Sequence, residues 1–463
     1  MNRRWKMNWK KTIALALTFI VLGAYVYFVE IKQHESKKQL EEKSKKVFNF
    51  VTDSVKTIAL KNSFGQFVIK KIQGEWRITE PIYTQADKST ITTMLNSLKN
   101  SKKETTFSVA PGELAQYGLG QGAIKVRLSL EDGSTDSLEL GEKTPVGAYV
   151  YTAKTDSQVF TINSSVKSTL DKKLFDIRDK KYLHFKRDQV QNITLRNRYG
   201  KYEFEKTGDK DWTFVNIQRP ANKANLNSIL SKLEYSNAKA FVDETGTKLR
   251  QYGLSKPAYQ VDLLVGTDKG RKRLIISRKI KGKYYAKDDS RKPIFQIDSL
   301  LVKDINKKMK DFRDTDFAEF KQGEVNRIEI EYPDTLIRLQ KDTTNNWLLA
   351  DSAGRKAEIS KINSFFSNFN YSKIEEFVKD GKYNPAKYGF DKPSLKLSLY
   401  RDDQLLLQAT FGKKKGKNYY ATTSAYQSVY LVSETKFKQL KLKLDKILEP
   451  KPQPEKSGEQ KAA

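Results

Sequence analysis

Tyr117-Gly118-Leu119 returns in this chain as Tyr252-Gly253-Leu254 and as Tyr388-Gly389-Phe390, at intervals of about 135 residues. Tryptophan keeps the same interval, at Trp76, Trp212 and Trp347. Agreement between two unrelated markers indicates that most of the protein is one unit present in three copies. Each copy is well beyond the roughly 20 to 50 residues of a solenoid repeat, so each can bury a core of its own.

The pattern within each repeat predicts an α+β fold. A helix is expected after each tryptophan, because apolar residues at i, i+3, i+4 and i+7 share one helical face. These residues are Ile91, Met94, Leu95 and Leu98, then Leu226, Ile229, Leu230 and Leu233, then Ile362, Phe365, Phe366 and Phe369. At the Tyr-Gly turn we expect a glycine with positive φ or close packing. The strict alternation from Ile124 to Leu130 then predicts a strand with one buried face, and a second helix from Leu170 to Ile177 ends the repeat.

The sequence therefore predicts three tandem homologous units after an N-terminal transmembrane helix, each with a mixed or antiparallel sheet and about two helices. The expected segments are a basic N-terminus 1–11, a membrane anchor 12–29, a charged stalk 30–46, repeats at 47–184, 185–319 and 320–448, and a disordered tail 449–463.

The N-terminus determines the expected location of the protein. No charged side chain interrupts Thr12 to Val29, and a helix of this length reaches roughly 27 Å, close to the thickness of the bilayer core. A cleaved signal peptide is the alternative, but the bulky run from Tyr25 to Val29 is unlike a cleavage site. The basic residues from Arg3 to Lys11 favour a cytoplasmic N-terminus, which places the rest of the chain outside.

Composition limits the chemistry available to the protein. The 463 residues include 86 Lys and Arg against 55 Asp and Glu, a net charge of +31, and no cysteine. Absence of cysteine suits an oxidising compartment and leaves no thiolate chemistry. The only histidines are His34 and His184, too few for a histidine metal site or a catalytic triad.

Two sequence patterns are weak candidates for catalysis. The stretch from Gly412 to Asn418 resembles a phosphate-binding loop, but its glycines are too close and Asn418 replaces the Ser or Thr that binds magnesium. We predict a hairpin there instead. The acid pairs Asp288-Asp289 and Asp402-Asp403 leave carboxylate catalysis open, although turns are the commoner use of Asp. We therefore predict no enzyme, no cofactor and no metal site.

Basic clusters are the strongest positive signal for binding. One function that suits them is contact with an anionic partner, namely lipid headgroups or surface polysaccharide. The alternative is that Lys and Arg protect exposed edge strands from self-pairing. Nucleic acid is not expected outside the cytoplasm. The candidate residues are Lys269, Arg271, Lys272, Arg273, Arg278, Lys279, Lys281 and Lys283 in the second repeat, and Lys413, Lys414, Lys415 and Lys417 in the third.

The ends of the repeats differ in one informative respect. Arg178-Asp179 and Arg313-Asp314 end the first two repeats, whereas Leu448-Glu449 ends the third, which has no successor. We expect Arg178 and Arg313 to hold the junction to the next repeat through charge-assisted hydrogen bonds. The alternative is an ordinary surface arginine, since most surface ion pairs contribute little.

Several short motifs resemble the bacterial family called domain of unknown function 4340. They are Glu80-Pro81, Ala86-Asp87-Lys88, Gln116-Tyr117-Gly118-Leu119, Leu140-Gly141-Glu142-Lys143-Thr144-Pro145 and Tyr149-Val150-Tyr151. The resemblance covers nearly all of the chain after the stalk. It implies a single-pass membrane protein with repeated extracytoplasmic units, encoded beside ABC-2-type exporters and gliding-motility-like auxiliary subunits, and it implies no catalytic residues.

Two departures from these motifs limit what they imply. Ser352-Ala353-Gly354 replaces the Glu-Pro lead-in of the third copy, and Ser277 replaces the glycine found at Gly141 and Gly412.

The expected function is a non-enzymatic scaffold or accessory subunit of an ABC-type export or gliding-motility-like system. The alternative is an extracytoplasmic module that binds anionic envelope polymers or lipid headgroups. The expected location is the bacterial inner membrane, spanned by residues 12–29, with an ABC permease and an auxiliary subunit as partners.

Overall fold

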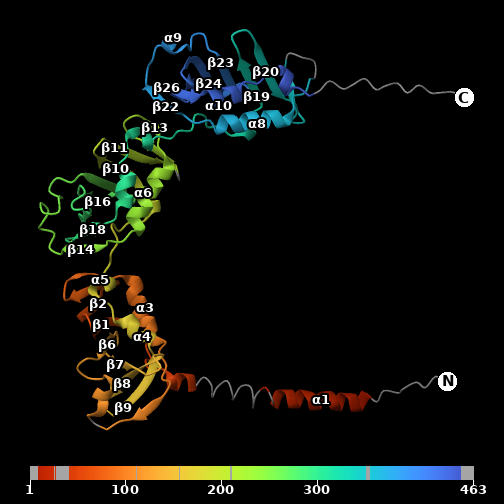
Figure 1. Cartoon of the computed structure of the whole chain (residues 1–463). Coiled ribbons are helices and arrows are strands. Elements are labelled where there is room, and N and C mark those ends of the chain that lie inside the picture. Colours follow the sequence, from red (N-terminus) through yellow and green to blue (C-terminus); the bar gives the residue numbers. More distant parts are fainter. Residues whose placement is uncertain are drawn as a thin grey trace, which may run out of the picture. The chain divides into compact units, whose positions relative to one another are not determined.

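A computed structural model describes residues 9–25, 27, 41–110, 112–155, 157–208, 211–350 and 355–449. The chain forms two compact units, one ending at Lys180 and the other beginning at Lys181. The first repeat lies in the first compact unit, while the second and third repeats lie together in the second. In Figure 1 the colour runs from red and orange in the first repeat, through green in the second, to blue in the third.

Helical segments precede the first repeat in the described part of the chain. Helix α1 spans Trp9–Tyr25, and residues 41–45 are also helical. Within the part of the chain that the structure describes, no helix is both long enough and apolar enough to cross a membrane. The predicted anchor continues to residue 29, and residues 26, 28 and 29 lie outside the described residues, as do 1–8, most of the stalk and the tail from 450. The membrane anchor therefore stays a prediction.

The first repeat is one antiparallel sheet with helices, in the order β4-β3-β2-β1-β6-β7-β8-β9-β5 over its described residues. The strands are β1 Val55–Asn62, β2 Gly65–Ile72, β3 Glu75–Glu80, β4 Thr84–Gln85, β5 Thr106–Ser108, β6 Ile124–Leu130, β7 Thr135–Lys143, β8 Tyr149–Thr155 and β9 Gln158–Asn163. The helices are η2 Thr52–Ser54, α3 Lys88–Lys99, η3 Glu113–Tyr117, α4 Ser165–Leu170 and α5 Leu174–Ile177.

The second repeat has the same arrangement, with the order β13-β12-β11-β10-β15-β16-β17-β18-β14. Its strands are β10 Val190–Asn197, β11 Gly200–Thr207, β12 Asp211–Phe214, β13 Arg219–Pro220, β14 Ala240–Asp243, β15 Tyr259–Val265, β16 Gly270–Ile276, β17 Tyr284–Asp288 and β18 Ile294–Ile297. Its helices are η4 Arg187–Gln189, α6 Lys223–Tyr235, α7 Ser299–Ile305 and η5 Met309–Phe312.

The third repeat keeps this order with one edge strand fewer among the described residues, β21-β20-β19-β23-β24-β25-β26-β22. Its strands are β19 Arg327–Glu331, β20 Leu336–Lys341, β21 Trp347–Leu349, β22 Glu376–Asp380, β23 Leu395–Arg401, β24 Gln404–Lys415, β25 Asn418–Thr423 and β26 Tyr426–Ser433. Its helices are η6 Gln322–Glu324, α8 Ile359–Asn370, α9 Pro385–Tyr388, α10 Glu434–Leu440 and α11 Leu444–Ile447. Three tandem α+β repeats are thus confirmed.

Each repeat buries one helical stripe against one sheet face. The four apolar residues predicted for each of α3, α6 and α8 are the buried residues of those helices. The side chains of Asp87 and Asn222 accept hydrogen bonds from the backbone N–H groups of Thr90 and Asn225, which caps the first two helices. Each repeat has a hydrophobic core of its own, so the repeat is the unit of folding.

The helix predicted to end each repeat is in fact two short helices. In the first repeat the break lies between α4 and α5, where Asn62 Nδ2 donates to the carbonyls of Leu170 and Lys172, at 2.9 Å each. Asn197 makes the equivalent pair of bonds in the second repeat. A side-chain amide that takes up free carbonyls lets the first helix end without an unsatisfied backbone. The sequence prediction missed this break because the apolar spacing continues across it.

The second and third repeats begin a few residues earlier than the sequence boundaries. Tyr182 and Leu183, assigned to the first repeat, lie in the core of the second, and Phe317 and Ala318 lie in the core of the third. These lead-in segments form bridges to the chain after the first helix, Lys181 to Asn237 and Asp316 to Lys373. The interval of about 135 residues, counted from the buried Val47, leads to Tyr182 and Phe317 and could have located both starts.

Candidate functional site

The Tyr-Gly markers form a turn that packs against the sheet in each repeat. Gly118, Gly253 and Gly389 have φ of +70°, +67° and +79°. Their tyrosines pack against tyrosines of the sheet, with ring centroids 5.0 Å apart for Tyr117 and Tyr151, 4.9 Å for Tyr252 and Tyr285, and 5.0 Å for Tyr388 and Tyr420. Trp76, Trp212 and Trp347 are buried core residues. The residues shared by all three repeats therefore have structural roles. Residues that differ between the repeats are the better candidates for function.

The basic residues predicted as one patch in the second repeat occupy separate places. Strand β16 alternates, so Arg271 and Arg273 lie on the sheet face opposite the core, which we call the open face, while Lys272 lies on the other side. Lys269 is at the turn between β15 and β16. The remaining four lie in the loop 277–283 between β16 and β17, which we call the hairpin tip, and are Arg278, Lys279, Lys281 and Lys283.

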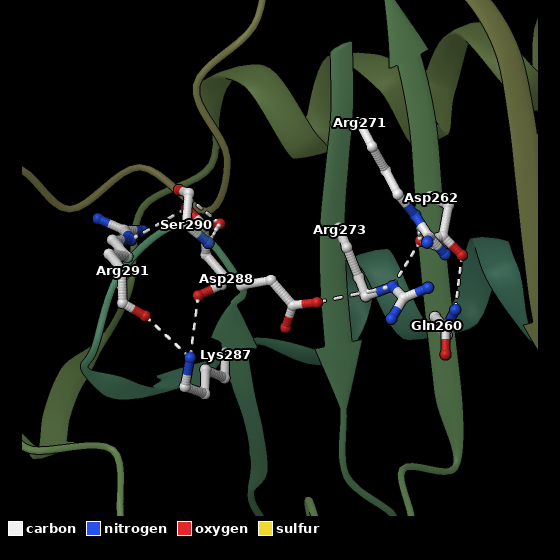
Figure 2. A network of polar contacts seen from close by, with 9 residues as sticks. Gln260, Asp262, Arg271, Arg273, Lys287, Asp288, Ser290 and Arg291 are labelled. Carbon is white, nitrogen blue, oxygen red and sulfur yellow. Dashed lines mark hydrogen bonds and ion pairs between the residues drawn. The ribbon is translucent and has the colours of Figure 1, made fainter. Parts of the chain in front are cut away.

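The open face carries a buried carboxylate held by two arginines. Asp262 of β15 is only 8% exposed. Arg271 Nε donates to Asp262 Oδ1 at 3.0 Å and Arg273 Nε at 2.6 Å, while Gln260 donates to the other oxygen at 2.5 Å. Figure 2 shows both arginines reaching from β16 toward Asp262 on the adjacent strand. Sequence reasoning missed Asp262, because a polar residue between Val261 and Leu263 is what an alternating strand with one buried face leads one to expect.

The hairpin tip is a cluster of free cations. Its four basic side chains, defined above, are exposed, and none forms an ion pair within the described part of the chain. The corresponding hairpin of the third repeat joins β24 and β25, which confirms that the stretch from Gly412 to Asn418 is a hairpin. There Lys414 pairs with Glu434 at 2.7 Å and Lys415 lies over the Tyr420 ring, while Lys413 and Lys417 are exposed. Of these two hairpins, the one in the second repeat therefore carries more unpaired positive charge.

The acid pairs considered for catalysis have turn roles in the structure. Asp288, 1% exposed, accepts from the backbone and the hydroxyl of Ser290, both at 2.8 Å, and pairs with Arg291 at 3.3 Å. Lys287 donates to the carbonyls of Asp288 and Arg291, as Figure 2 shows. Asp402 accepts from Asn326. Among the described residues no group of three or more His, Cys, Asp or Glu could hold a metal ion.

Arg313 lies at the junction between the second and third repeats. Its Nη1 and Nη2 donate to the two carboxylate oxygens of Asp380 at 2.7 and 2.9 Å, a bidentate pair. The guanidinium also lies 3.7 Å from the centre of the Phe377 ring. Arg313 is 5% exposed. A buried, bidentate and stacked arginine is geometrically far better defined than a surface ion pair.

A second arginine joins the same carboxylate. Arg219 Nε donates to Ser428 Oγ at 3.0 Å, and its guanidinium lies 3.7 Å from Asp380 and over the Tyr426 ring. Burial alone would raise the pKa of Asp380. Hydrogen bonds and charge from Arg313, the Ser428 hydroxyl and the charge of Arg219 outweigh burial and hold that pKa below its usual value. Asp380 is therefore ionised at neutral pH, and the two arginines clamp the third repeat to the second.

The backbone at the repeat ends is the same in all three copies. Arg178, Arg313 and Leu448 form equivalent bridges, to Ala86, Ala221 and Ala357. The next residue in each repeat, Asp179, Asp314 or Glu449, donates its N–H to the lead-in of the first helix. Only the side chain changes, and Leu448 packs in the core of the third repeat. The backbone is therefore the same at all three ends, and only the side chain at the position of Arg178, Arg313 and Leu448 differs in its role.

Several hollows occur among the described residues of the second compact unit. One of about 330 Å³ lies on the open face around Asp262 and Arg273. Another of about 190 Å³ lies at the junction, beside Arg219, Arg313 and Tyr426. A groove of about 720 Å³ runs between α8 and the closing helices of the third repeat. A hollow of about 440 Å³ lies beside Glu205, Lys206 and Lys269. Polar and charged side chains of sheet strands line both this hollow and the one around Asp262.

Comparison with known proteins gives one family match. The family model described as "Domain of unknown function (DUF4340)" matches residues 76–234, 212–385 and 347–457. No curated protein matches the chain. Among solved structures, the crystal structure of DNA polymerase sliding clamp from Pseudomonas aeruginosa with ligand shares 6% identity, covering 85% of this chain and 94% of that one. Its TM-score is 0.14, a value at which the likeness carries no argument.

Proposed function

Because the chain belongs to the Domain of unknown function (DUF4340) family, we propose that it is a non-enzymatic, membrane-anchored scaffold or accessory subunit of an ABC-type export system. The observation that carries this proposal is the junction between the second and third repeats. A bidentate Arg313–Asp380 pair, backed by Arg219, fixes two copies of one fold to each other. Tandem copies joined in this way suit a protein that positions partners better than one that turns over a substrate.

The proposed location rests on the N-terminal sequence. The uncharged run from Thr12 to Val29 would cross the inner membrane and the basic residues before it would stay in the cytoplasm. The repeats would then face the periplasm or its equivalent, where an ABC permease and its auxiliary subunit present their outer loops. A fusion of alkaline phosphatase after Lys46 should be active in cells, and an inactive fusion would contradict this orientation.

The accessory role is tested by purification from native membranes. A tagged full-length chain should retain an ABC permease and its ATPase after extraction in mild detergent. The matched control is a chain with the 12–29 segment replaced by an unrelated transmembrane helix, which keeps the anchor but not its sequence. If neither chain retains a permease or ATPase, the scaffold proposal is wrong.

A second candidate function is favoured by the hairpin tip. Four exposed cations without ion-pair partners among the described residues suit docking onto an anionic surface, either lipid headgroups or an envelope polymer. Each Lys or Arg near an anionic membrane contributes about 1 kcal/mol. Replacing Arg278 and Lys279 by Ala should lower binding to vesicles of phosphatidylglycerol or to an anionic glycan at low salt. Replacing the ion-paired Lys125 and Lys154 of the first repeat removes the same charge and should have little effect.

A further inference from the structure

We infer that the open face of the second repeat is a binding site for a single phosphoryl group carried on a small organic molecule or a lipid. The inference does not depend on the accessory role. Side chains from four strands surround the hollow of about 330 Å³, which is at the lower end of the size range of ligand pockets. Its lining includes the side chains of Arg196, Lys201, Gln260, Asp262, Arg271 and Arg273.

The side chains that line this hollow carry a net positive charge, which favours an anionic ligand. Four of the lining residues are cationic and one, Asp262, is anionic. Lys201 forms an ion pair with Glu203 at the edge, and Arg273 pairs with Asp289 at 3.6 Å as well as with Asp262, so Arg196 carries the charge that no acid balances. Arg196 forms no ion pair or side-chain hydrogen bond within the described part of the chain and is exposed. An exposed arginine beside two others repels them unless an anion lies between, so the arrangement favours an anionic ligand.

Asp262 positions the arginines as well as neutralising part of their charge. It is buried, and it receives the Nε group of both Arg271 and Arg273. Because Nε is bound, the guanidinium of Arg273 is fixed in direction, and its two Nη groups donate no hydrogen bond within the described part of the chain and are available to a ligand. A guanidinium held in this way loses little conformational freedom when it binds a ligand.

The residues at the equivalent positions of the first and third repeats differ from those in the second. The register that joins Thr194, Asp262 and Arg273 across three strands has an equivalent in each copy. In the first repeat it joins Ala59, Arg127 and Ser137, and in the third it joins Glu329, Ser398 and Gln408. Arg196 corresponds to Lys61 and to Glu331. Since all three repeats fold alike, the fold does not require this cluster.

A phosphoryl group fits the donors better than a carboxylate does. A phosphate monoester offers three peripheral oxygens and nearly two negative charges, whereas a carboxylate offers two oxygens and one charge. The hollow presents guanidinium groups on two sides, from Arg196 on β10 and from Arg271 and Arg273 on β16, with the amide of Gln260 between them. A phosphate monoester can accept hydrogen bonds from both sides with three oxygens and nearly twice the charge of a carboxylate, which favours it over a carboxylate in this hollow.

The test measures binding of glycerol 3-phosphate to the full-length protein in detergent by titration calorimetry. We expect saturable binding with one site per chain, and affinity for lactate, a carboxylate of similar size, at least tenfold weaker. Arg196→Ala should weaken the binding of glycerol 3-phosphate at least tenfold, since a charge-assisted hydrogen bond and a point charge are lost. Arg196→Lys should recover part of the affinity. Arg271 and Arg273 are left intact because their loss would leave the buried Asp262 without its cationic partners.

Arg250→Ala is the matched control, since it removes the same charge from an exposed residue of the second repeat outside both the hollow and the hairpin tip, and it should change affinity less than twofold. Vesicles distinguish the source of the phosphoryl group. If only vesicles of phosphatidic acid, whose headgroup is a phosphate monoester, bind, and binding is sensitive to Arg196→Ala, the ligand is a lipid headgroup. The inference is overturned if neither probe saturates, if lactate binds as tightly, or if Arg196→Ala and Arg250→Ala weaken binding equally. These outcomes leave the copurification result unaffected, so the two proposals fail separately.

Discussion

At the scale of single residues, the close fit of the Tyr-Gly turn to the sheet explains why these residues recur. A Cβ atom on Gly412 would lie 2.1 Å from the carbonyl oxygen of Tyr388, and one on Gly141 would lie 2.1 Å from that of Tyr117. Both distances are far below van der Waals contact. In the second repeat Ser277 stands at this position, and a Cβ on Gly253 would approach the Ser277 Cβ no closer than 3.5 Å. The turn of the second repeat therefore lies farther from its strand.

We predict that Gly412→Ala destabilises the third repeat by about 2 kcal/mol, because the turn must move away from the strand and lose its ring contacts. Chemical denaturation followed by circular dichroism would measure the free energy of unfolding. Gly323→Ala is the control, since it lies in the same repeat with nothing within 4 Å of an added Cβ. Equal stability of the two variants would contradict the close-packing explanation.

Arg313 gives a second prediction at this scale. Removing it leaves Asp380 without its bidentate partner, and the loss of one member of a partly buried pair is costly. We expect Arg313→Ala to increase the rate of limited proteolysis near Phe320 at least tenfold. Arg313→Lys should give an intermediate rate because a lysine cannot reproduce the two parallel bonds. Arg401→Ala, an exposed ion-paired arginine of the third repeat, should leave the cleavage rate unchanged.

The residues that sequence reasoning identified differ from those it missed in a simple physical way. Arg313 stands out because the ends of the repeats can be compared with one another. Its acceptor Asp380 does not, because it lies 67 residues further along the chain and only the sheet order brings β22 to the junction. Asp262 is likewise neighbour to Arg273 only through the pairing of β15 with β16. Contacts between distant residues need a register that periodicity alone does not supply.

At the scale of elements, the helices were predictable and their ends were not. The stripe at i, i+3, i+4 and i+7 identified every buried residue of α3, α6 and α8. The break between α4 and α5 depends on Asn62, more than a hundred residues earlier, whose amide takes up the carbonyls there. Edge strands such as β4 and β13, two residues each, have no periodicity to detect.

The helical stripe leads to a prediction on the first repeat. Leu95 on α3 is 1% exposed, and a lysine there must bury its charge or leave the core. We expect Leu95→Lys to lower the free energy of unfolding by about 4 kcal/mol or more and to unfold the first repeat. Asn96→Lys adds the same charge one residue away on the exposed side and should change stability by less than about 0.5 kcal/mol. Hydrogen exchange resolved by peptide would show whether the loss of protection is confined to residues before Lys180.

At the scale of the whole molecule, three repeats form two compact units because one junction is built into the second unit. Within that unit the second and third repeats share a clamp of Arg219, Arg313 and Asp380 but keep separate cores. A clamp between separate cores couples their unfolding only while its charges are present. The coupling is therefore expected to depend on the ionisation of Asp380.

The sign of the pH dependence follows from the lowered pKa of Asp380. A carboxylate with a pKa below its ordinary value of about 3.9 stabilises the native state fully above that value, and the contribution is lost as the pH falls through the native pKa. We predict that calorimetry at pH 7 shows the second compact unit unfolding in one transition. Below the native pKa of Asp380 that transition should separate into two, one for each repeat.

Asp380→Asn tests whether this single group is responsible, since the amide keeps the shape of the carboxylate without its charge. The variant should show the separated transitions already at pH 7, with no further separation on acidification, because the group that titrates is gone. Asp403→Asn is the control, as its exposed carboxylate pairs only loosely with Arg327 at 3.4 Å. A single transition for Asp380→Asn at pH 7 would mean that the two repeats are coupled by apolar contacts of Phe377 and Tyr426 instead, with the ion pair contributing orientation and little stability.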